Sequence, residues 1–251
     1  MVATFLARSA QPRTDYDNIG AANSLDIVPV SGPIGALVRG IDLTQALDAK
    51  TVRGINDAWS EHLVLVFRGQ NLTIAQHLAF ASLLGEILEG NATSRTALSD
   101  THRGLLEVST LDENGDQRES GLSNAEAFWH TDMSYKPVPP AGSFLYSREV
   151  PEDGGNTCFA NMYLAYETLP EDLLHLIDGR TAVHDESRNS AGRMRAGFED
   201  IRDPHHTLGP HHPLVRTHPV TGRKALFLGR RPYSYIPGLA LTDSEALLDR
   251  L

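Results

Sequence analysis

A histidine and a carboxylate stand two residues apart in the run Phe128-Trp129-His130-Thr131-Asp132. In a strand, residues i and i+2 project to the same face, so the side chains of His130 and Asp132 could bind one cation. With a second histidine, imidazole and carboxylate form the ligand set of non-haem iron(II) oxygenases, which leaves coordination positions open for a co-substrate and O₂. The pair therefore indicates iron-dependent oxidation, although a surface His and Asp at a strand end is the simpler interpretation of three residues alone.

The segments before this pair contain a predicted scaffold of short strands and two helices. Apolar runs predict strands near residues 25–30 and 35–41, and a strand buried on both faces at 63–67. Helical spacing predicts one helix from Leu43 to Ala58, with Asp42 or Thr44 as its N-cap. A second helix is predicted from Thr73 to Leu84, with Thr73 as its cap.

From Gly104 onward, short strands alternate with polar loops, which is typical of an antiparallel sandwich or jelly roll. Residues 186–210 are dense in Arg, Asp, His and Gly and have little period, so we expect a lid-like insertion there. Residues 1–24 are polar and without period, which predicts a flexible N-terminal arm. Residues 25–251 are then expected to form a single domain.

The composition and net charge indicate which partners and which compartment suit the protein. The chain has 251 residues, 41% of them hydrophobic, which is enough to bury a substantial core. Its 32 Asp and Glu against 22 Lys and Arg give a net charge of −10, which would repel nucleic-acid phosphates and anionic membrane surfaces. The single cysteine, Cys158, excludes an intrachain disulfide and suits a reducing cytoplasm. We expect a cytoplasmic homo-oligomer with no nucleic-acid or membrane partner.

Five segments of the sequence together are more specific than the His-X-Asp triplet alone. They are Leu65-Val66-Phe67-Arg68-Gly69-Gln70, Trp129-His130-Thr131-Asp132, Pro139-Pro140-Ala141, Gly154-Gly155-Asn156-Thr157, and His212-Pro213-Leu214-Val215-Arg216-Thr217-His218-Pro219. In their residues, order and intervals they resemble the TauD/TfdA (taurine/2,4-dichlorophenoxyacetate dioxygenase) family of Fe(II)/2-oxoglutarate-dependent dioxygenases, and the similarity runs from about Leu25 to the end of the chain. The resemblance implies a mainly β fold with flanking helices (α+β), built on a double-stranded β-helix of the jelly-roll, cupin-like type.

The resemblance also implies roles for particular residues. His130 and Asp132 match the metal ligands and act as catalytic residues through the iron, and Thr157 matches the threonine that hydrogen-bonds the distal carboxylate of 2-oxoglutarate. A hydroxyl that follows a Gly-Gly turn can approach a carboxylate closely. Tyr135 lies where the family places an aromatic near substrate, but it could equally be a core residue. Glu126 replaces an Asn near substrate and would disfavour a second anion close by.

The family's third ligand, a distal His, and its 2-oxoglutarate-binding Arg correspond to positions beyond Leu251. We therefore expect a C-terminally truncated chain that lacks the last strands of the β-helix. Other histidines could substitute as the third ligand, although a cluster of exposed histidines is more often polar surface. The candidates are His184, His205, His206, His211, His212 and His218.

The resemblance implies an Fe(II)- and 2-oxoglutarate-dependent dioxygenase that uses O₂, hydroxylates a small organic acid, and releases succinate and CO₂. The substrate is expected to be of the alkylsulfonate, alkyl sulfate or aryloxyalkanoate type. One of Arg188, Arg193, Arg195 and Arg230 could bind its anionic group, although a solvated surface charge is the simpler interpretation of each. The alternatives are a catalytically inactive jelly-roll binding protein and a cupin-type metal hydrolase or isomerase.

Overall fold

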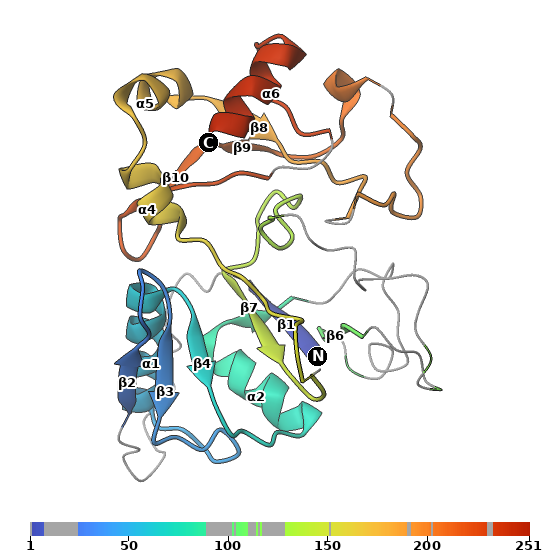
Figure 1. Cartoon of the computed structure of the whole chain (residues 1–251). Helices are drawn as coiled ribbons and strands as arrows, with labels where there is room; N and C mark the ends of the chain where they lie inside the picture. Colours follow the sequence, from blue (N-terminus) through green and yellow to red (C-terminus); the bar gives the residue numbers. More distant parts are fainter. Residues whose placement is uncertain are drawn as a thin grey trace.

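The structure is a computed structural model of the chain. It describes residues 25–88, 102, 104–109, 114, 116, 129–150, 152–189, 192–201, 203–229 and 233–251, together with the backbone of residues 2–7. Figure 1 shows two groups of elements, one from the first part of the chain and one from the last part.

The first group begins with a three-stranded sheet in the order β2-β3-β4. Strands β2 (Asp26–Pro29) and β3 (Ala36–Arg39) are antiparallel, and β3 pairs in parallel with β4 (Leu65–Phe67). A parallel pair needs a long crossover, which here contains helix α1 (Ala49–His62). Strand β4 was predicted to be buried on both faces, but its residues are only half-buried because it is an edge strand.

Capping side chains fix where the two N-terminal helices begin. The predicted start of α1 near Leu43 is wrong: Asp48 caps the helix by accepting a hydrogen bond from the Thr51 N–H at 2.7 Å. Asp42 instead accepts from the Thr44 N–H and closes a separate turn. Helix α2 (Ile74–Leu84) is confirmed, with a reciprocal capping box between Thr73 and Gln76. Such a cap typically contributes about 1 kcal/mol.

A second sheet connects the N-terminal helices to the candidate site. Strand β7 (Gly142–Tyr146) pairs antiparallel with β1 (Val2–Ala7), which also pairs with β5 (Glu86–Ile87) and β6 (Leu106–Glu107). The N-terminal arm expected over residues 1–24 is therefore a strand over Val2–Ala7. The composition of this run, with Val, Thr, Phe and Leu, suits a strand, and its pairing with β7 supplies the backbone hydrogen bonds that an arm would lack. Residues 8–24 lie outside the described part of the chain.

The second group of elements contains short helices and two antiparallel strand pairs. Strand β8 (Thr181–Val183) pairs with β9 (His211–Pro213), and β10 (Val215–Thr217) pairs with β11 (Lys224–Leu226). The second pair is a hairpin, because only residues 218–223 connect its strands. The helices of this group are α4 (Met162–Glu167), α5 (Glu171–Ile177), the 3₁₀ helix η1 (Pro204–His206) and α6 (Leu241–Arg250).

Each group has its own hydrophobic core. The N-terminal core is built from α1, α2 and the segment before α1, and its buried members are Leu43, Leu47, Val52, Ile55 and Phe80. The C-terminal core is built from α5, α6 and strands β8 to β11, and its buried members are Leu173, Ile177, Ala182, Leu214, Leu226, Ile236, Leu247 and Leu248. Residues 129–141, which run between these two groups of elements, can therefore be anchored to both of them.

The described residues form a mixed helical and stranded fold. Their strands are grouped in sheets of four, three, two and two strands. The double-stranded β-helix is not directly visible in these sheets and stays a prediction. Within the described part of the chain, no helix is long and apolar enough to cross a membrane.

Candidate metal centre

His130 and Asp132 lie in the segment of residues 129–141 that runs between the two groups of elements, in yellow-green in Figure 1. One side of this segment is tied to β7, because the Ser143 hydroxyl donates to Asp132. The other side is tied to β9, because His212 Nε2 lies 3.0 Å from the backbone oxygen of Lys136. The candidate ligands are thus held by both halves of the molecule.

The two predicted ligands meet in space. Nε2 of His130 lies 3.3 Å from Oδ1 of Asp132, and the side chains are 24% and 43% exposed. They were expected on a strand, but residues 129–131 are irregular and residues 132–135 form turns. The chain turns because the Ser134 N–H donates to Thr131 O and the Lys136 N–H donates to Met133 O. A nitrogen and an oxygen donor converge at a solvent-accessible point, as a metal site that admits small molecules requires.

The second oxygen of Asp132 has a hydrogen-bond donor that the sequence analysis missed. The Ser143 hydroxyl donates to Oδ2 of Asp132 at 2.9 Å. Neighbouring positions on β7 serve the opposite face, where the Phe144 ring makes an edge contact with Phe80 of α2 at 5.5 Å. The hydrogen bond leaves Oδ1 turned toward His130 and fixes the orientation of the carboxylate, as outer-sphere partners of metal ligands do.

The residue after Asp132 has an unusual backbone conformation. Met133 has φ 51°, in the left-handed region that side chains other than glycine rarely adopt. The next residue, Ser134, is almost fully buried. A strained residue between a ligand and a buried anchor directs the Asp132 carboxylate toward His130 at some cost in stability.

Tyr135 lies beside charged side chains and is not a core residue. Its ring is half-buried, and the guanidinium carbon of Arg195 lies 3.9 Å from the ring centroid. The ammonium group of Lys136 lies 5.5 Å from the same centroid. Of the three candidate arginines that the structure describes, Arg195 is therefore the one with a described contact to Tyr135.

The other predicted site residues are not joined to the pair by a described contact. Thr157 is exposed in the irregular segment between β7 and α4, after Gly154 and Gly155, whose φ values are 80° and 66°. Glycine adopts this left-handed conformation without strain, and the contact of Thr157 with 2-oxoglutarate stays a prediction. Glu126 and Arg230 lie outside the described residues.

Two of the histidines weighed as a third ligand belong to a buried aromatic cluster. The His184 ring stacks on Phe227 at 5.1 Å and meets the His212 ring edge-on at 4.7 Å. A Cβ at Gly229 would overlap the His184 ring, so the backbone at Gly229 passes directly against this ring. Burial lowers the pKa of His212, and the nearby charge of Arg216 lowers it further, despite the bond to Lys136 O. Among the described residues, no group of three or more His, Cys, Asp or Glu side chains could hold a metal ion.

The segment expected to form a lid is anchored at its beginning by buried polar contacts. Asp185 accepts hydrogen bonds from the backbone N–H and hydroxyl of Ser187 at 2.8 and 2.6 Å. Arg188 is 6% exposed, donates to Asp200 at 2.6 Å, and packs over the Tyr233 ring at 4.0 Å. Arg188 is thus a structural residue that connects the two ends of its own loop.

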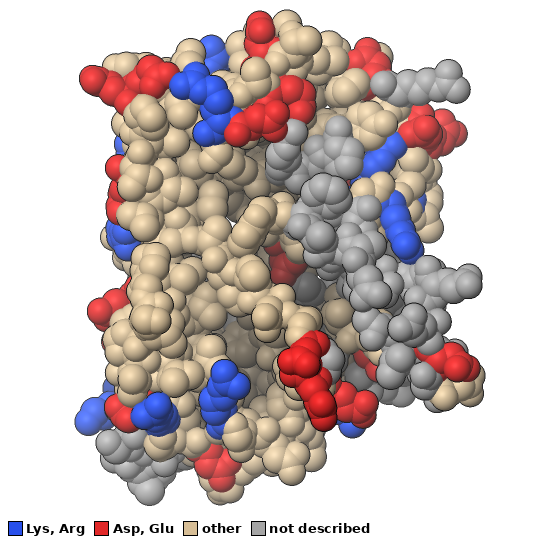
Figure 2. Space-filling view, viewed as in Figure 1, with Lys and Arg blue, Asp and Glu red and all other residues tan. Residues whose placement is uncertain are grey.

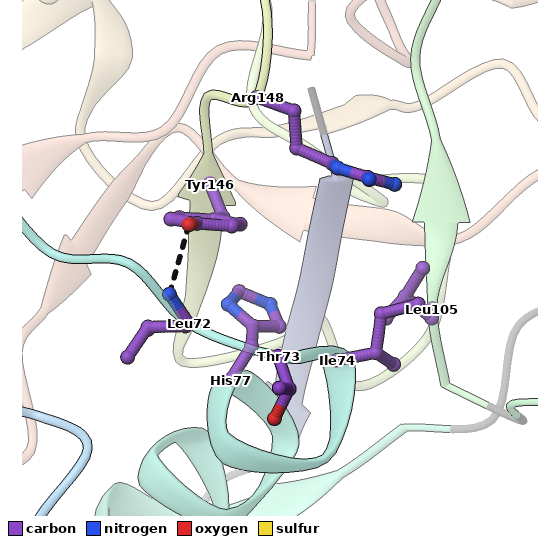
Figure 3. Close-up of a pocket in the computed structure, with 7 residues that line it drawn as sticks. All are labelled: Leu72, Thr73, Ile74, His77, Leu105, Tyr146 and Arg148. Carbon is purple, nitrogen blue, oxygen red and sulfur yellow. Dashed lines mark hydrogen bonds between the residues drawn. The ribbon is translucent and has the colours of Figure 1, made fainter.

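A separate cavity of about 230 Å³ lies between the start of α2 and the end of β7. In Figure 3, His77 points into it from α2, and Arg148 extends across the opposite side. The Tyr146 hydroxyl accepts from the Leu72 N–H at 2.9 Å, and burial lowers the pKa of His77. The polar groups here serve mainly to join α2 to β7, the strand that also supports Asp132.

Charged side chains on the face in Figure 2 are interspersed. The figure shows acidic and basic groups over the described part of this face, with no continuous patch of one sign.

Comparisons with known proteins identify the family. Residues 26–251 match the model of the taurine catabolism dioxygenase TauD, TfdA family. The chain belongs to this family. It is 34% identical to a (S)-phenoxypropionate/alpha-ketoglutarate-dioxygenase of Delftia acidovorans, over 91% of this chain and 78% of that protein. It is 36% identical to an alpha-ketoglutarate-dependent sulfate ester dioxygenase of Pseudomonas putida, over 90% of this chain and 73% of that protein.

Solved structures agree with this assignment. A taurine dioxygenase from Burkholderia xenovorans superposes with a TM-score of 0.66 at 31% identity, over 90% of this chain and 70% of that one. The protein AAD-2, solved with Mn(II) and N-oxalylglycine, gives a TM-score of 0.69 at 27% identity, over 90% of this chain and 78% of that one. The predicted family is confirmed, and the chain is a non-haem Fe(II)- and 2-oxoglutarate-dependent dioxygenase.

The described donors fit the metal that this family uses. Iron(II) binds imidazole nitrogen together with carboxylate oxygen, and His130 and Asp132 present these two atoms 3.3 Å apart. The Ser143 bond to the other carboxylate oxygen supplies the outer partner that such sites usually have. The two residues would supply two of the three protein ligands of a facial triad, and this role stays a prediction.

Proposed function

We propose that this dioxygenase hydroxylates a small organic acid, with His130 and Asp132 as two of its iron ligands. The 3.3 Å convergence of their donor atoms at a solvent-accessible point carries this proposal. For each turnover, the substrate gains one oxygen atom of O₂, and 2-oxoglutarate takes the other as it forms succinate and CO₂.

When bound, the iron and 2-oxoglutarate supply the oxidising chemistry, and the protein supplies geometry. His130 and Asp132 would hold the metal, and Ser143 would keep Oδ2 of Asp132 occupied so that Oδ1 is available for coordination. Thr157 would donate its hydroxyl to the distal carboxylate of 2-oxoglutarate. Tyr135 would line the substrate side of the site, together with Glu126.

The substrate class is inferred from the relatives and from the charges near Tyr135. Similar proteins are named for phenoxypropionate, sulfate esters and 2,4-dichlorophenoxyacetate, all of which carry an anionic group. The cations Arg195 and Lys136 on the Tyr135 ring would suit such a group. We therefore propose an aryloxyalkanoate, alkyl sulfate or alkylsulfonate as substrate.

The wider organisation follows the same proposal. We propose that residues 25–251 belong to one jelly-roll domain and that residues 186–210 act as a lid over the substrate. The neighbours with TM-scores of 0.66 and 0.69 support the fold, and the position of Arg195 on Tyr135 supports the lid. We also propose a cytoplasmic homo-oligomer, for which the lone exposed Cys158 suits a reducing compartment.

The decisive experiment adds Fe(II) and 2-oxoglutarate to the metal-free protein without O₂. The chelate should give a weak visible charge-transfer band, and O₂ with a panel of the three acid classes should then yield succinate and hydroxylated product. Absence of the band would favour a binding protein without iron chemistry. Turnover that needs neither O₂ nor 2-oxoglutarate would favour a metal hydrolase or isomerase.

A further inference from the structure

Two cationic side chains share the ring of Tyr135. The central carbon of the Arg195 guanidinium lies 3.9 Å from the ring centroid, and the Lys136 ammonium lies 5.5 Å from it. Among the described residues, neither cation forms an ion pair with a carboxylate, in contrast to Arg188 and Arg223. Like charges gathered on one ring without a described counter-ion create a positive local potential, which favours an anionic ligand.

Arg195 is oriented by its backbone contacts. Its backbone N–H donates to Ser187 O at 2.8 Å, and its Nε donates to Arg188 O at 3.3 Å. Arg188 is itself fixed by Asp200 at 2.6 Å. The base of the Arg195 side chain is therefore anchored to a buried arginine, and its terminal Nη atoms donate no hydrogen bond to any other described residue.

Tyr135, whose ring Arg195 contacts, lies close to the metal pair along the chain. Tyr135 follows Asp132 by three residues, so their Cα atoms can be at most about 11 Å apart, and the intervening turns shorten this distance. Small organic acids are of the size that can span such a gap, with a reactive carbon toward the metal and an anionic group toward Arg195.

We propose that Arg195 is a specificity-determining residue that binds the anionic group of the substrate, with Tyr135 as the surface that orients its guanidinium. This inference rests on the proposed function and deepens it. A planar guanidinium presents two parallel N–H donors to a carboxylate or sulfate, and stacking on an aromatic ring leaves those edges available. The charge pair with Asp200 makes Arg188 unsuited to this role.

The test compares binding of (S)-2-phenoxypropionate with binding of its neutral primary amide. Each is titrated into the Fe(II)- and 2-oxoglutarate-loaded protein without O₂, and the shift of the charge-transfer band and the calorimetric Kd are recorded. The wild-type protein should bind the acid more tightly than the amide. Arg195→Gln should weaken acid binding about ten- to a hundredfold while leaving amide binding nearly unchanged. Arg195→Lys keeps the charge but loses the planar donors, so it should retain part of the preference.

Arg193→Gln is the matched control, because Arg193 lies exposed on the same segment two residues away and should keep the wild-type preference. Tyr135→Leu should reduce the preference, whereas Tyr135→Phe should retain it. If Arg195→Gln keeps the wild-type ratio of acid to amide affinity, Arg195 does not bind the anion. A wild-type protein that gives the charge-transfer band but does not prefer the acid would refute the proposed substrate class and this inference with it. A wild-type protein without the band would refute the iron chemistry itself.

Discussion

Two pairs of neighbouring side chains that include histidine, one exposed and one buried, differ in their surroundings. His130 and Asp132 are 24% and 43% exposed, and their polar atoms face each other. His184 and His212 are 0% and 6% exposed, and their rings face each other and Phe227. The first pair presents nitrogen and oxygen to solvent, while the second uses imidazole as an aromatic packing unit.

The difference shows that proximity of histidines does not by itself indicate a metal site. In the buried pair, aromatic contacts surround the rings and burial holds the pKa of His212 below its usual value. In the exposed pair, the local turn brings two unlike donor atoms together. A metal site that must admit co-substrate and O₂ needs the arrangement of the exposed pair, His130 and Asp132.

The largest expected effect comes from removing a ligand of the exposed pair. His130→Ala or Asp132→Ala should abolish Fe(II) binding, measured by calorimetry, and succinate formation, measured by chromatography. Because both side chains are partly exposed, circular dichroism should show an unchanged fold. Retention of stoichiometric Fe(II) binding by either variant would contradict the assignment of the site.

Truncation of the buried pair should instead affect stability. His184→Ala leaves a cavity beside Phe227 and should lower the free energy of unfolding by about 2–4 kcal/mol, measured by urea denaturation. The folded fraction should still bind Fe(II). His205→Ala is the control, because that imidazole is about half exposed at 52% and should change stability little. A stable His184→Ala protein that no longer binds Fe(II) would contradict this distinction, because it would assign metal binding to the buried pair.

Loss of the Ser143 hydroxyl should weaken the metal site without removing it. Ser143→Ala frees Oδ2 of Asp132 from its donor and should raise the Kd for Fe(II) about tenfold. Ser143→Thr keeps a hydroxyl on a strand and should restore most of the affinity. Equal Fe(II) affinity of the alanine variant and the wild type would show that the hydrogen bond does not orient the ligand.

Thr157→Val tests a residue that has no described contact with the pair. Removal of one hydroxyl donor to a carboxylate should raise the 2-oxoglutarate concentration required for half-maximal succinate formation about tenfold. The Kd for Fe(II) alone should not change. A matched loss of iron affinity would assign Thr157 to the metal site or to folding.

The smallest expected effect concerns pH. Burial lowers the pKa of His77 in the folded protein below the ordinary value of 6.5, so the unfolded chain binds the proton more readily. The resulting stability is present above pH 6.5 and is lost as the pH falls below that value. Urea denaturation at pH 7.5 and 5.5 should show that the free energy of unfolding falls less between these pH values for His77→Gln than for the wild type. Identical losses would mean that His77 does not contribute to acid sensitivity.

Some local signals in the sequence were sufficient to predict local structure. Thr73 was predicted as the cap of α2 because capping depends on residues within one turn, and the close approach of His130 and Asp132 likewise depends on residues two apart. The start of α1 was misplaced because Asp42 and Asp48 are both good caps, and only the structure shows that Asp42 closes a turn with Thr44.

The side chains that contact Asp132 and Tyr135 from other parts of the chain could not be predicted from sequence spacing. Ser143 reaches Asp132 because β7 returns past the turn, and Arg195 reaches Tyr135 because its loop is anchored by Arg188. Both contacts depend on tertiary packing. The family resemblance predicts His130 and Asp132 as ligands, and this stays a prediction. Residue identity alone did not distinguish Arg195 from the other arginines of the segment.

The backbone of Met133 has a consequence for protein engineering. Its φ of 51° is a conformation that glycine adopts without strain, so a search for stabilised variants would favour Met133→Gly. The same change would widen the range of directions open to Asp132, because a glycine hinge would adjoin the ligand. Selection for thermal tolerance alone would thus act against selection for turnover at this position.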